Sequence, residues 1–173
     1  RGGRGMCVWM LSVRELARLL RGRRTWLAAA LTVLSPLAGL TVYRSASADT
    51  MQSLYVANPA LAGGVVGGIL FGLLTVYELD RTERSRVGML MDAAVSPLTM
   101  ALVRLPALAA AAVLGLGLTM LVWLPISREL IGSVFGGTDY LLSYLLFMGL
   151  ALWLAILAAA AAYQFTRRSD LSL

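Results

Sequence analysis

Four long apolar stretches constrain the fold of this chain more than any other feature. They run approximately over residues 25–43, 59–77, 98–124 and 141–163, and each is close to or above the length of helix, about 20 residues, that crosses a bilayer. All six tyrosines lie at or near the ends of these stretches, where an interfacial aromatic belt would place them. The pattern predicts an all-α fold, a polytopic bundle of four transmembrane helices in a transmembrane domain over residues 25–173.

The composition supports membrane insertion and excludes several kinds of chemistry. Hydrophobic residues make up 59% of the chain and charged residues 14%, against roughly 45–50% and about 25% in soluble domains. A small soluble domain could not bury that much apolar surface. The absence of lysine excludes a Walker-type phosphate loop. The absence of histidine excludes imidazole catalysis and a His-based metal site, and Cys7, the only cysteine, forms no intrachain disulfide. We therefore expect no catalytic residue, no cofactor, no metal and no enzymatic activity in the chain itself.

The arginines predict the orientation in the membrane. Of the 15 arginines, all except Arg44 and Arg128 lie before residue 25, between residues 78 and 104, or after residue 163. Cytoplasmic loops of membrane proteins are enriched in basic residues. Both termini are therefore predicted to be cytoplasmic, in a multi-pass protein of the cell membrane. The alternative is a signal peptide cleaved near Ala48, although the first stretch is longer than the usual apolar core of such a peptide.

Residues 1–24 are predicted to form a basic leader and an interfacial amphipathic helix. Within residues 9–24, four apolar side chains can share one helical face and three arginines another. A basic amphipathic helix beside a membrane usually lies in the plane of the interface. The apolar face would hold Val13, Leu16, Ala17 and Leu20, and the basic face Arg14, Arg18 and Arg21. The alternative is a solvated basic leader that only sets the topology.

The second apolar stretch is rich in glycine, which predicts close helix packing. Three overlapping pairs of small residues are spaced four apart, and they involve Gly63, Gly64, Gly67, Gly68 and Gly72. In lipid the hydrophobic effect gives helices little reason to associate, so close approach of the backbones through glycine supplies the dispersion contacts. We predict a tightly packed helix or a dimer seam. The alternative is a simple excess of glycine in the composition.

The segment 78–97, between the second and third stretches, combines charged and apolar residues. Acids precede arginines at spacings that favour a helix, and a short apolar group with two methionines follows, ending before Pro97. Such a group is too short to span a membrane and suits a docking surface. The residues predicted to couple to a partner are Glu78, Asp80, Arg81, Glu83, Arg84, Arg86, Met89, Leu90, Met91 and Asp92. The alternative is a solvated loop.

These segments resemble the membrane subunit of type-2 ATP-binding-cassette exporters. In that family an interfacial helix precedes the first span, and the charged loop after the second span contains a coupling helix that docks on a separate ATPase subunit. The matching pieces are VRELARLLRGRRTWLAAAL at 13–31 and FGLLTVYELDRTERSRVGMLMDAAVSPLTMALVRL at 71–105. The family usually has six spans in each membrane unit, so this chain with four stretches resembles a short or truncated form.

The resemblance implies a permease subunit that forms the membrane pathway of an exporter while a partner hydrolyses ATP. The expected partners are an ATP-binding-cassette ATPase subunit, a second permease subunit in a homo- or heterodimer, and the lipid bilayer, with no nucleic acid. No Asp, Glu or His lies within the four stretches, which argues against an ion-coupled transporter, because such a protein generally needs an ionisable group at membrane depth. The alternative function is a membrane-embedded scaffold or regulatory anchor that recruits a cytoplasmic partner without transport.

Overall fold

The described part of the chain consists of helices and short connections. The computed structural model describes the backbone of residues 2–41, 53–84 and 97–170, and side chains over 10–41, 54–81 and 103–165. The α-helices are α1 (Gly2–Arg21), α2 (Arg23–Leu34), α3 (Pro36–Thr41), α4 (Asn58–Arg84), α6 (Pro97–Ile131), α7 (Gly137–Ser143) and α8 (Leu150–Asp170). The short elements are the π-helices η1 (Ser53–Ala57) and η3 (Tyr144–Gly149) and the 3-10 helix η2 (Gly132–Val134). The predicted all-α fold is confirmed.

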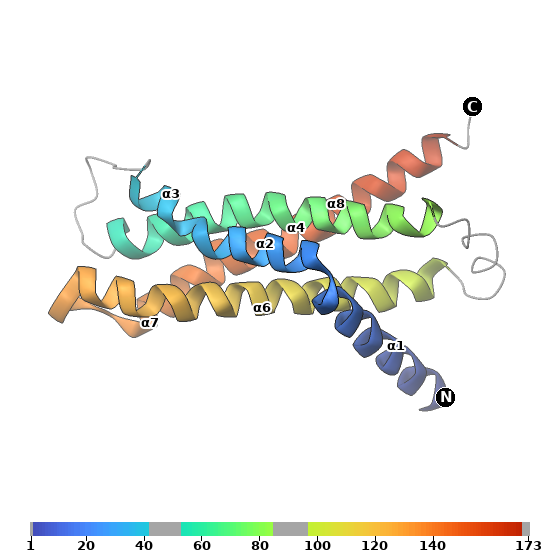
Figure 1. Cartoon of the computed structure of the whole chain (residues 1–173), viewed down its shortest axis with the longest axis horizontal. Helices are drawn as coiled ribbons and strands as arrows, with labels where there is room; N and C mark the ends of the chain where they lie inside the picture. Colours follow the sequence, from blue (N-terminus) through green and yellow to red (C-terminus); the bar gives the residue numbers. More distant parts are fainter. Residues whose placement is uncertain (1, 42–52, 85–96, 171–173) are drawn as a thin grey trace.

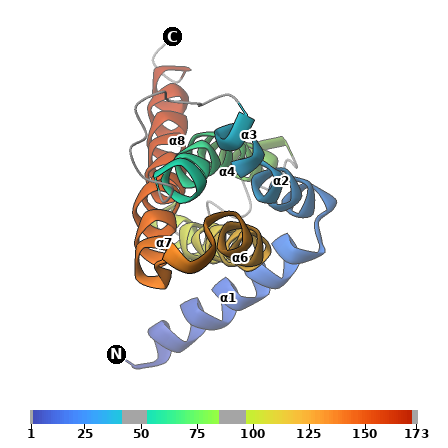
Figure 2. The ribbon, with the colours of Figure 1, turned by 90° about the vertical axis from the view of Figure 1, so that its left-hand side faces the viewer.

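The long helices form an elongated bundle. Helices α4 and α6 run along its length (Figure 1), and the continuous rod of α7, η3 and α8 lies on one side of them (Figure 2). Helices α2 and α3 follow α4 on the opposite side, while α1 passes obliquely against α6 (Figure 2). Helix α4 contacts α2, α3 and α8, so it is the central element of the bundle. The C-terminal ends of α4 and α8 and the beginning of α6 lie at one end of the molecule (Figure 1).

Three helices are long and apolar enough to cross a membrane. They are Leu54–Arg81, Val103–Val134 and Gly137–Phe165, with 28, 32 and 29 residues. The second, third and fourth predicted stretches lie within α4, α6 and the α7–η3–α8 rod, so these three predictions are confirmed. This architecture is that of a multi-pass membrane protein.

The first predicted stretch, 25–43, differs from the prediction of one continuous helix. Residues 42 and 43 lie outside the described residues, and the rest divides at Ser35 into α2 and α3. Pro36 has no backbone N–H and so cannot donate to the carbonyl of Thr32, four residues earlier. The Ser35 hydroxyl donates to that carbonyl oxygen over 2.6 Å and the Ser35 N–H over 3.3 Å. The Thr32 carbonyl at the break therefore has hydrogen-bond donors from the neighbouring Ser35. Helices α2 and α3 are each too short to span a membrane alone.

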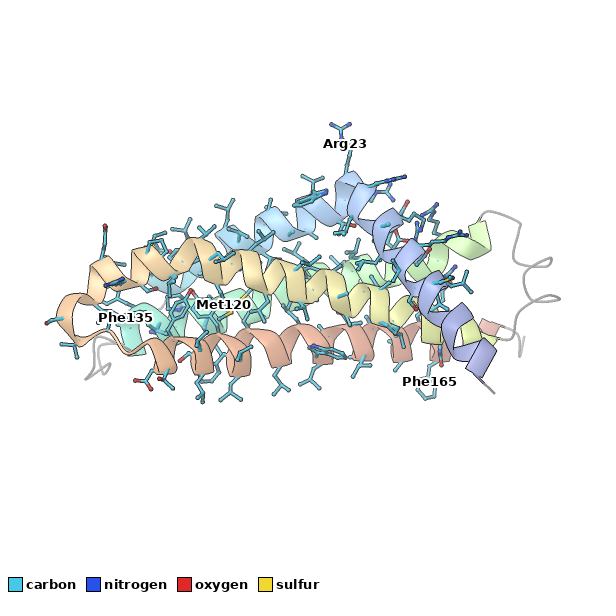
Figure 3. All side chains as sticks on the ribbon, turned by 90° about the horizontal axis from the view of Figure 1, so that it is seen from below. Arg23, Met120, Phe135 and Phe165 are labelled. Atoms are coloured by element: carbon cyan, nitrogen blue, oxygen red, sulfur yellow. The ribbon has the colours of Figure 1, made fainter. Side chains whose placement is uncertain are left out.

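Apolar side chains both fill the interior and cover the outside of the bundle. The interior contains the fully buried side chains of Phe71, Leu108, Tyr144 and Met148. The side chains that point outward, Phe165 among them (Figure 3), are also largely apolar. Large exposed apolar residues on the three long rods include Val65, Ile69, Leu73, Leu114, Leu121, Leu146, Leu150 and Leu154. An exposed apolar surface of this extent is unusual for a soluble monomer and suits contact with lipid.

Candidate functional site

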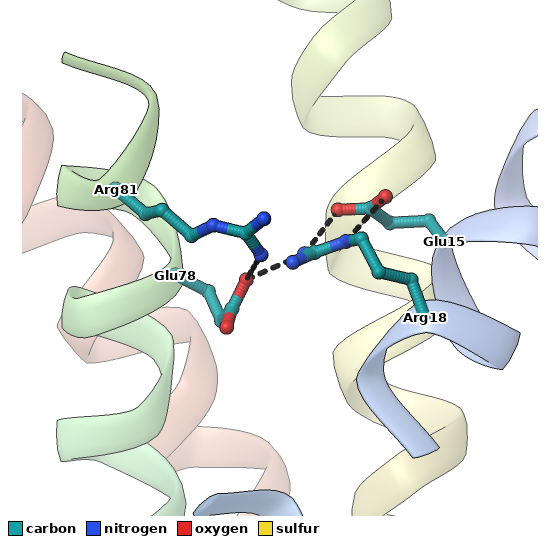
Figure 4. Close-up of polar contacts among 4 residues, drawn as sticks. All are labelled: Glu15, Arg18, Glu78 and Arg81. Carbon is teal, nitrogen blue, oxygen red and sulfur yellow. Dashed lines mark hydrogen bonds and ion pairs between the residues drawn. The ribbon is translucent and has the colours of Figure 1, made fainter. Parts of the chain in front are cut away.

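Four charged side chains connect α1 to α4 and form the candidate site (Figure 4). The Arg18 guanidinium donates through Nε to Glu15 Oε2 over 3.0 Å and through Nη2 to Glu15 Oε1 over 2.5 Å. The same Nη2 donates to Glu78 Oε2, also over 2.5 Å. Arg81 Nη1 lies 3.7 Å from that Glu78 oxygen. Arg18 and Glu78 are 60 residues apart, so this charged cluster joins distant parts of the chain.

The charged cluster is shielded from water at its centre. The Glu78 side chain is 12% exposed and that of Arg18 34%, while Arg81, at 52%, reaches solvent. Burial acts to lower the pKa of Arg18, but its hydrogen bonds to Glu15 and Glu78 outweigh burial, and the pKa is raised above its ordinary value. A raised folded-state pKa contributes stability that is fully present below the unfolded-state value and is lost only as pH rises through the folded-state value. Arg18 therefore stays cationic across physiological pH.

The side of α1 that contacts the bundle differs from the apolar face that the sequence assigns to the membrane interface. The α1 helix itself is present, but Val13 is 48% exposed and Ala17 is also exposed. Leu19 is instead 3% exposed, and Leu16 packs against the core beside it. The contact face is turned by roughly a third of a helical turn from the predicted apolar face. Arg18, which lies on the predicted basic face, forms the ion pairs described above.

The sequence carried a signal for this contact that the hydrophobic pattern obscured. Glu15 and Arg18 are spaced three apart, which places them together on one helical face. Leu16 and Leu19 have the same spacing and flank that pair. A helix beside lipid need not turn its most apolar face toward protein, because lipid also accepts that face. The polar pair was therefore the better guide to the protein-facing side of α1.

The predicted coupling segment is described only in its first part. Glu78, Asp80, Arg81, Glu83 and Arg84 lie in the last two turns of α4, which continues as a helix to Arg84. Glu78 is directed toward Arg18 of α1, and Asp80 is half-buried. The remaining members of the predicted coupling set, Arg86, Met89, Leu90, Met91 and Asp92, lie outside the described residues. Val87 also lies outside them. One acid and arginine at such a helical spacing, Glu78 and Arg81, form an ion pair at 3.7 Å.

The glycines of α4 let two neighbouring helices approach its backbone. A Cβ atom on Gly64 would lie 2.5 Å from the carbonyl oxygen of Phe147 in η3, and one on Gly68 would lie 3.4 Å from Cβ of Ala155 in α8. Gly72 faces α8 one turn further on. These three positions therefore pack closely on η3 and α8 of the same chain.

The other two glycines face a different side of the α4 helix. A Cβ atom on Gly67 would lie 3.0 Å from Cγ2 of Thr32 in α2, and one on Gly63 would lie 3.5 Å from Cγ of Pro36 in α3. A Cβ atom at either position would also lie 3.1 Å from a side-chain atom of the rod formed by η3 and α8. Helix α4 is thus wedged between the α2–α3 pair and the α8 rod.

Neither a metal site among the described residues nor a similar known protein indicates a function for this chain. Among the described residues, no group of three or more Asp, Glu, Cys or His side chains could hold a metal ion. The chain matches no family model, no curated protein and no solved structure. Its function must therefore be inferred from the helices and the charged cluster themselves.

Proposed function

We propose that the chain is the permease subunit of an ATP-driven exporter, in which α1 and α4 transmit the movement of a cytoplasmic ATPase into the membrane. The observation that supports this most strongly is the ion pair between Arg18 and Glu78, because it ties an amphipathic N-terminal helix to the helix that leads into segment 78–97. An exporter powered by a separate ATPase needs such a connection between its docking segment and its membrane helices. The resemblance to type-2 ATP-binding-cassette exporters has the same two parts in the same order.

The proposal includes four membrane crossings, with α2 and α3 together as the first. Residues 23–41 extend to about 28 Å at 1.5 Å per residue, close to the bilayer core of about 30 Å. Their outward face is apolar, with exposed side chains at Trp26, Leu27, Leu31, Leu34 and Leu37. A broken helix is tolerated in a membrane where neighbouring groups satisfy the freed backbone, as Ser35 does here. Four crossings with cytoplasmic termini agree with the arginine distribution.

Helix α4 is suited to transmit a displacement. It has 27 residues, or about 40 Å of continuous helix, and no proline follows Pro59 within it. A push on its cytoplasmic end would act on α8 through Gly64 and Gly68, and on α1 through Glu78. Small shifts of packed helices are a known basis of such transitions.

Pull-down from native membranes, followed by mass spectrometry, tests the proposal. The wild-type chain should bring down a protein with nucleotide-binding motifs. The double variant Met89→Ala with Met91→Ala should lose it, because truncating an anchor in a well-packed interface often costs at least about 2 kcal/mol, roughly thirtyfold in affinity. Met10→Ala is the matched control, since Met10 lies on α1 and is 58% exposed.

Two results would contradict the proposal. If no nucleotide-binding protein accompanies the wild-type chain, the scaffold alternative replaces the exporter. If the double methionine variant retains the ATPase as fully as Met10→Ala does, the coupling role of segment 78–97 is wrong.

A further inference from the structure

A basic hollow opens beside the charged cluster, where α1, α2 and α4 meet. Its volume is about 410 Å³, within the usual range for small-ligand sites. Five of its lining residues are arginines and one is an acid, Glu78. The arginines are Arg18, Arg21, Arg23, Arg24 and Arg81.

The positive charge of the hollow is only partly balanced within the protein. Arg18 and Arg81 share the carboxylates of Glu15 and Glu78. No carboxylate within the described ranges pairs with Arg21 or Arg24. The Arg24 guanidinium lies over the ring of Tyr77, 3.8 Å from its centroid, which orients the cation without neutralising it. Arginines that line the same hollow repel one another, and a bound anion would relieve that repulsion.

The beginning of α2 independently indicates an anion. The first N–H groups of a helix have no acceptor within it, and the helix dipole favours negative charge there. Helix α2 begins at Arg23 with Gly22 as its N-cap, which makes no side-chain capping bond, and its first turn has no acid. Two arginines occupy that turn instead. Cations at a helix N-terminus are unfavourable unless an anion accompanies them, and phosphate is the group that such positions commonly bind.

The surroundings of the hollow are those of a lipid headgroup. Trp26 is 55% exposed, and its indole Nε1 donates to the carbonyl oxygen of Leu20 over 2.6 Å. Exposed Trp and Tyr side chains commonly mark the depth of the headgroups. Directly beyond Trp26, Leu27 and Leu31 are 62% and 50% exposed, so they can contact acyl chains. Figure 3 shows Arg23 projecting outward at this junction.

We propose that the hollow lined by Arg21 and Arg24 binds a phosphate group, presented as the headgroup of an anionic phospholipid. The guanidinium groups and the N–H groups of Arg23 and Arg24 at the start of α2 recognise the phosphate oxygens, because arginine and helix N-termini both match that geometry. The apolar side of α2 accepts the acyl chains. This site requires no ATPase partner, so it stands or falls independently of the proposed function.

The test measures lipid binding to the purified full-length chain in detergent by native mass spectrometry. Phosphatidylglycerol is the probe, phosphatidylcholine the zwitterionic comparison and inorganic phosphate the free source of the same group. The wild-type chain should bind phosphatidylglycerol saturably and more tightly than phosphatidylcholine. The double variant Arg21→Gln with Arg24→Gln should bind phosphatidylglycerol roughly thirtyfold more weakly, since each basic residue near an anionic headgroup contributes about fivefold, equivalent to about 1 kcal/mol.

The matched control is Arg14→Gln with Arg128→Gln. Both arginines lie outside the hollow, and the control removes the same charge, so the affinity for phosphatidylglycerol should change less than about twofold, because charges away from the bound headgroup are screened by solvent and salt. Circular dichroism checks that each variant is folded. If the double variant is not, the single variants Arg21→Gln and Arg24→Gln should each lose about fivefold.

Three results would overturn the proposal. An equal loss in the control would mean that only the overall charge matters. Equal affinity for phosphatidylglycerol and phosphatidylcholine would mean that the hollow does not select an anionic headgroup. If inorganic phosphate binds as tightly as phosphatidylglycerol and the Arg21 and Arg24 variants lose both, the site holds a soluble phosphate and the lipid assignment is wrong.

Discussion

A methyl group added at Gly64 tests the packing of α4 against the α8 rod. In Gly64→Ala the new Cβ would lie 2.5 Å from the carbonyl oxygen of Phe147 and 3.2 Å from Cα of Met148. These are backbone atoms, so no side-chain rotation removes the clash, and the two helices must separate by about 0.9 Å to restore ordinary contact at 3.4 Å. Overpacking of this kind costs about 1–3 kcal/mol.

Helix propensity acts in the opposite direction and has to be separated from the packing effect. Alanine is better than glycine in a helix interior by about 0.5–1 kcal/mol. Because the clash involves backbone, we expect a packing cost in the upper part of the range of about 1–3 kcal/mol. After the gain in helix propensity is subtracted, Gly64→Ala should lose about 1–2 kcal/mol of unfolding free energy. Gly117→Ala is the matched control, since a Cβ there has nothing within 4 Å. That variant should be neutral or gain up to about 1 kcal/mol from propensity alone.

Unfolding in mixed micelles of rising dodecyl sulfate fraction, followed by far-ultraviolet circular dichroism, measures both variants. The difference between them removes the propensity contribution, which is the same at the two sites, and should be about 2–3 kcal/mol. If Gly64→Ala and Gly117→Ala change the unfolding free energy equally, the close approach of α4 to η3 does not contribute to stability and the packing argument fails.

Two further predictions concern hydrogen bonds that join distant helices. A double-mutant cycle with Arg18→Gln and Glu78→Gln should give a coupling free energy of about 1 kcal/mol in the same unfolding assay. This value is below that for a fully buried pair because Arg18 is partly solvated. Additive effects of the two substitutions would mean that the pair does not join α1 to α4. Tyr140→Phe should lose about 0.5–1 kcal/mol, because the buried Tyr140 hydroxyl donates to the carbonyl oxygen of Met120 in α6 over 2.7 Å; an unchanged unfolding free energy would show that this bond contributes nothing.

Hydropathy along the chain predicted which segments become long helices, because helix length and apolar content are local properties. The stretches 59–77, 98–124 and 141–163 all lie within long helices. The same signal failed at 25–43, where the apolar content is equally high but Pro36 removes a backbone donor. The proline was visible in the sequence. The way in which Ser35 satisfies the Thr32 carbonyl depends on a backbone geometry that hydropathy does not encode.

The contacts of each helix were much less predictable than its existence. The glycines of α4 indicated close packing, but nothing in their spacing distinguishes α8, the α2–α3 pair or a second copy as the neighbour. The side of α1 that packs on the bundle was not predictable for a related reason. An amphipathic pattern identifies the face that avoids water, and beside a membrane both lipid and protein provide such a surface. Long-range pairs such as Arg18 with Glu78 depend on how the helices cross, which is set by the whole bundle.

The position of the charged cluster at one end of the bundle follows from the cost of charge in a bilayer. An arginine or glutamate near the bilayer centre is expensive, whereas near the interface a long arginine side chain can pack its apolar stem and still extend its guanidinium toward water. Tyr77 and Glu78 are adjacent in α4, so the residue that marks the interface directly precedes the residue that binds α1. Earlier in its sequence α4 contacts its neighbours through glycines and through buried apolar side chains such as Phe71, whereas at Glu78 it contacts α1 through ions. The inner contacts rest on dispersion, which salt does not screen, while the outer contacts rest on charge, which salt and nearby anions do. The contacts of α4 within the bundle are therefore insensitive to salt, whereas its contact with α1 at the charged cluster can be adjusted by salt and by nearby anions.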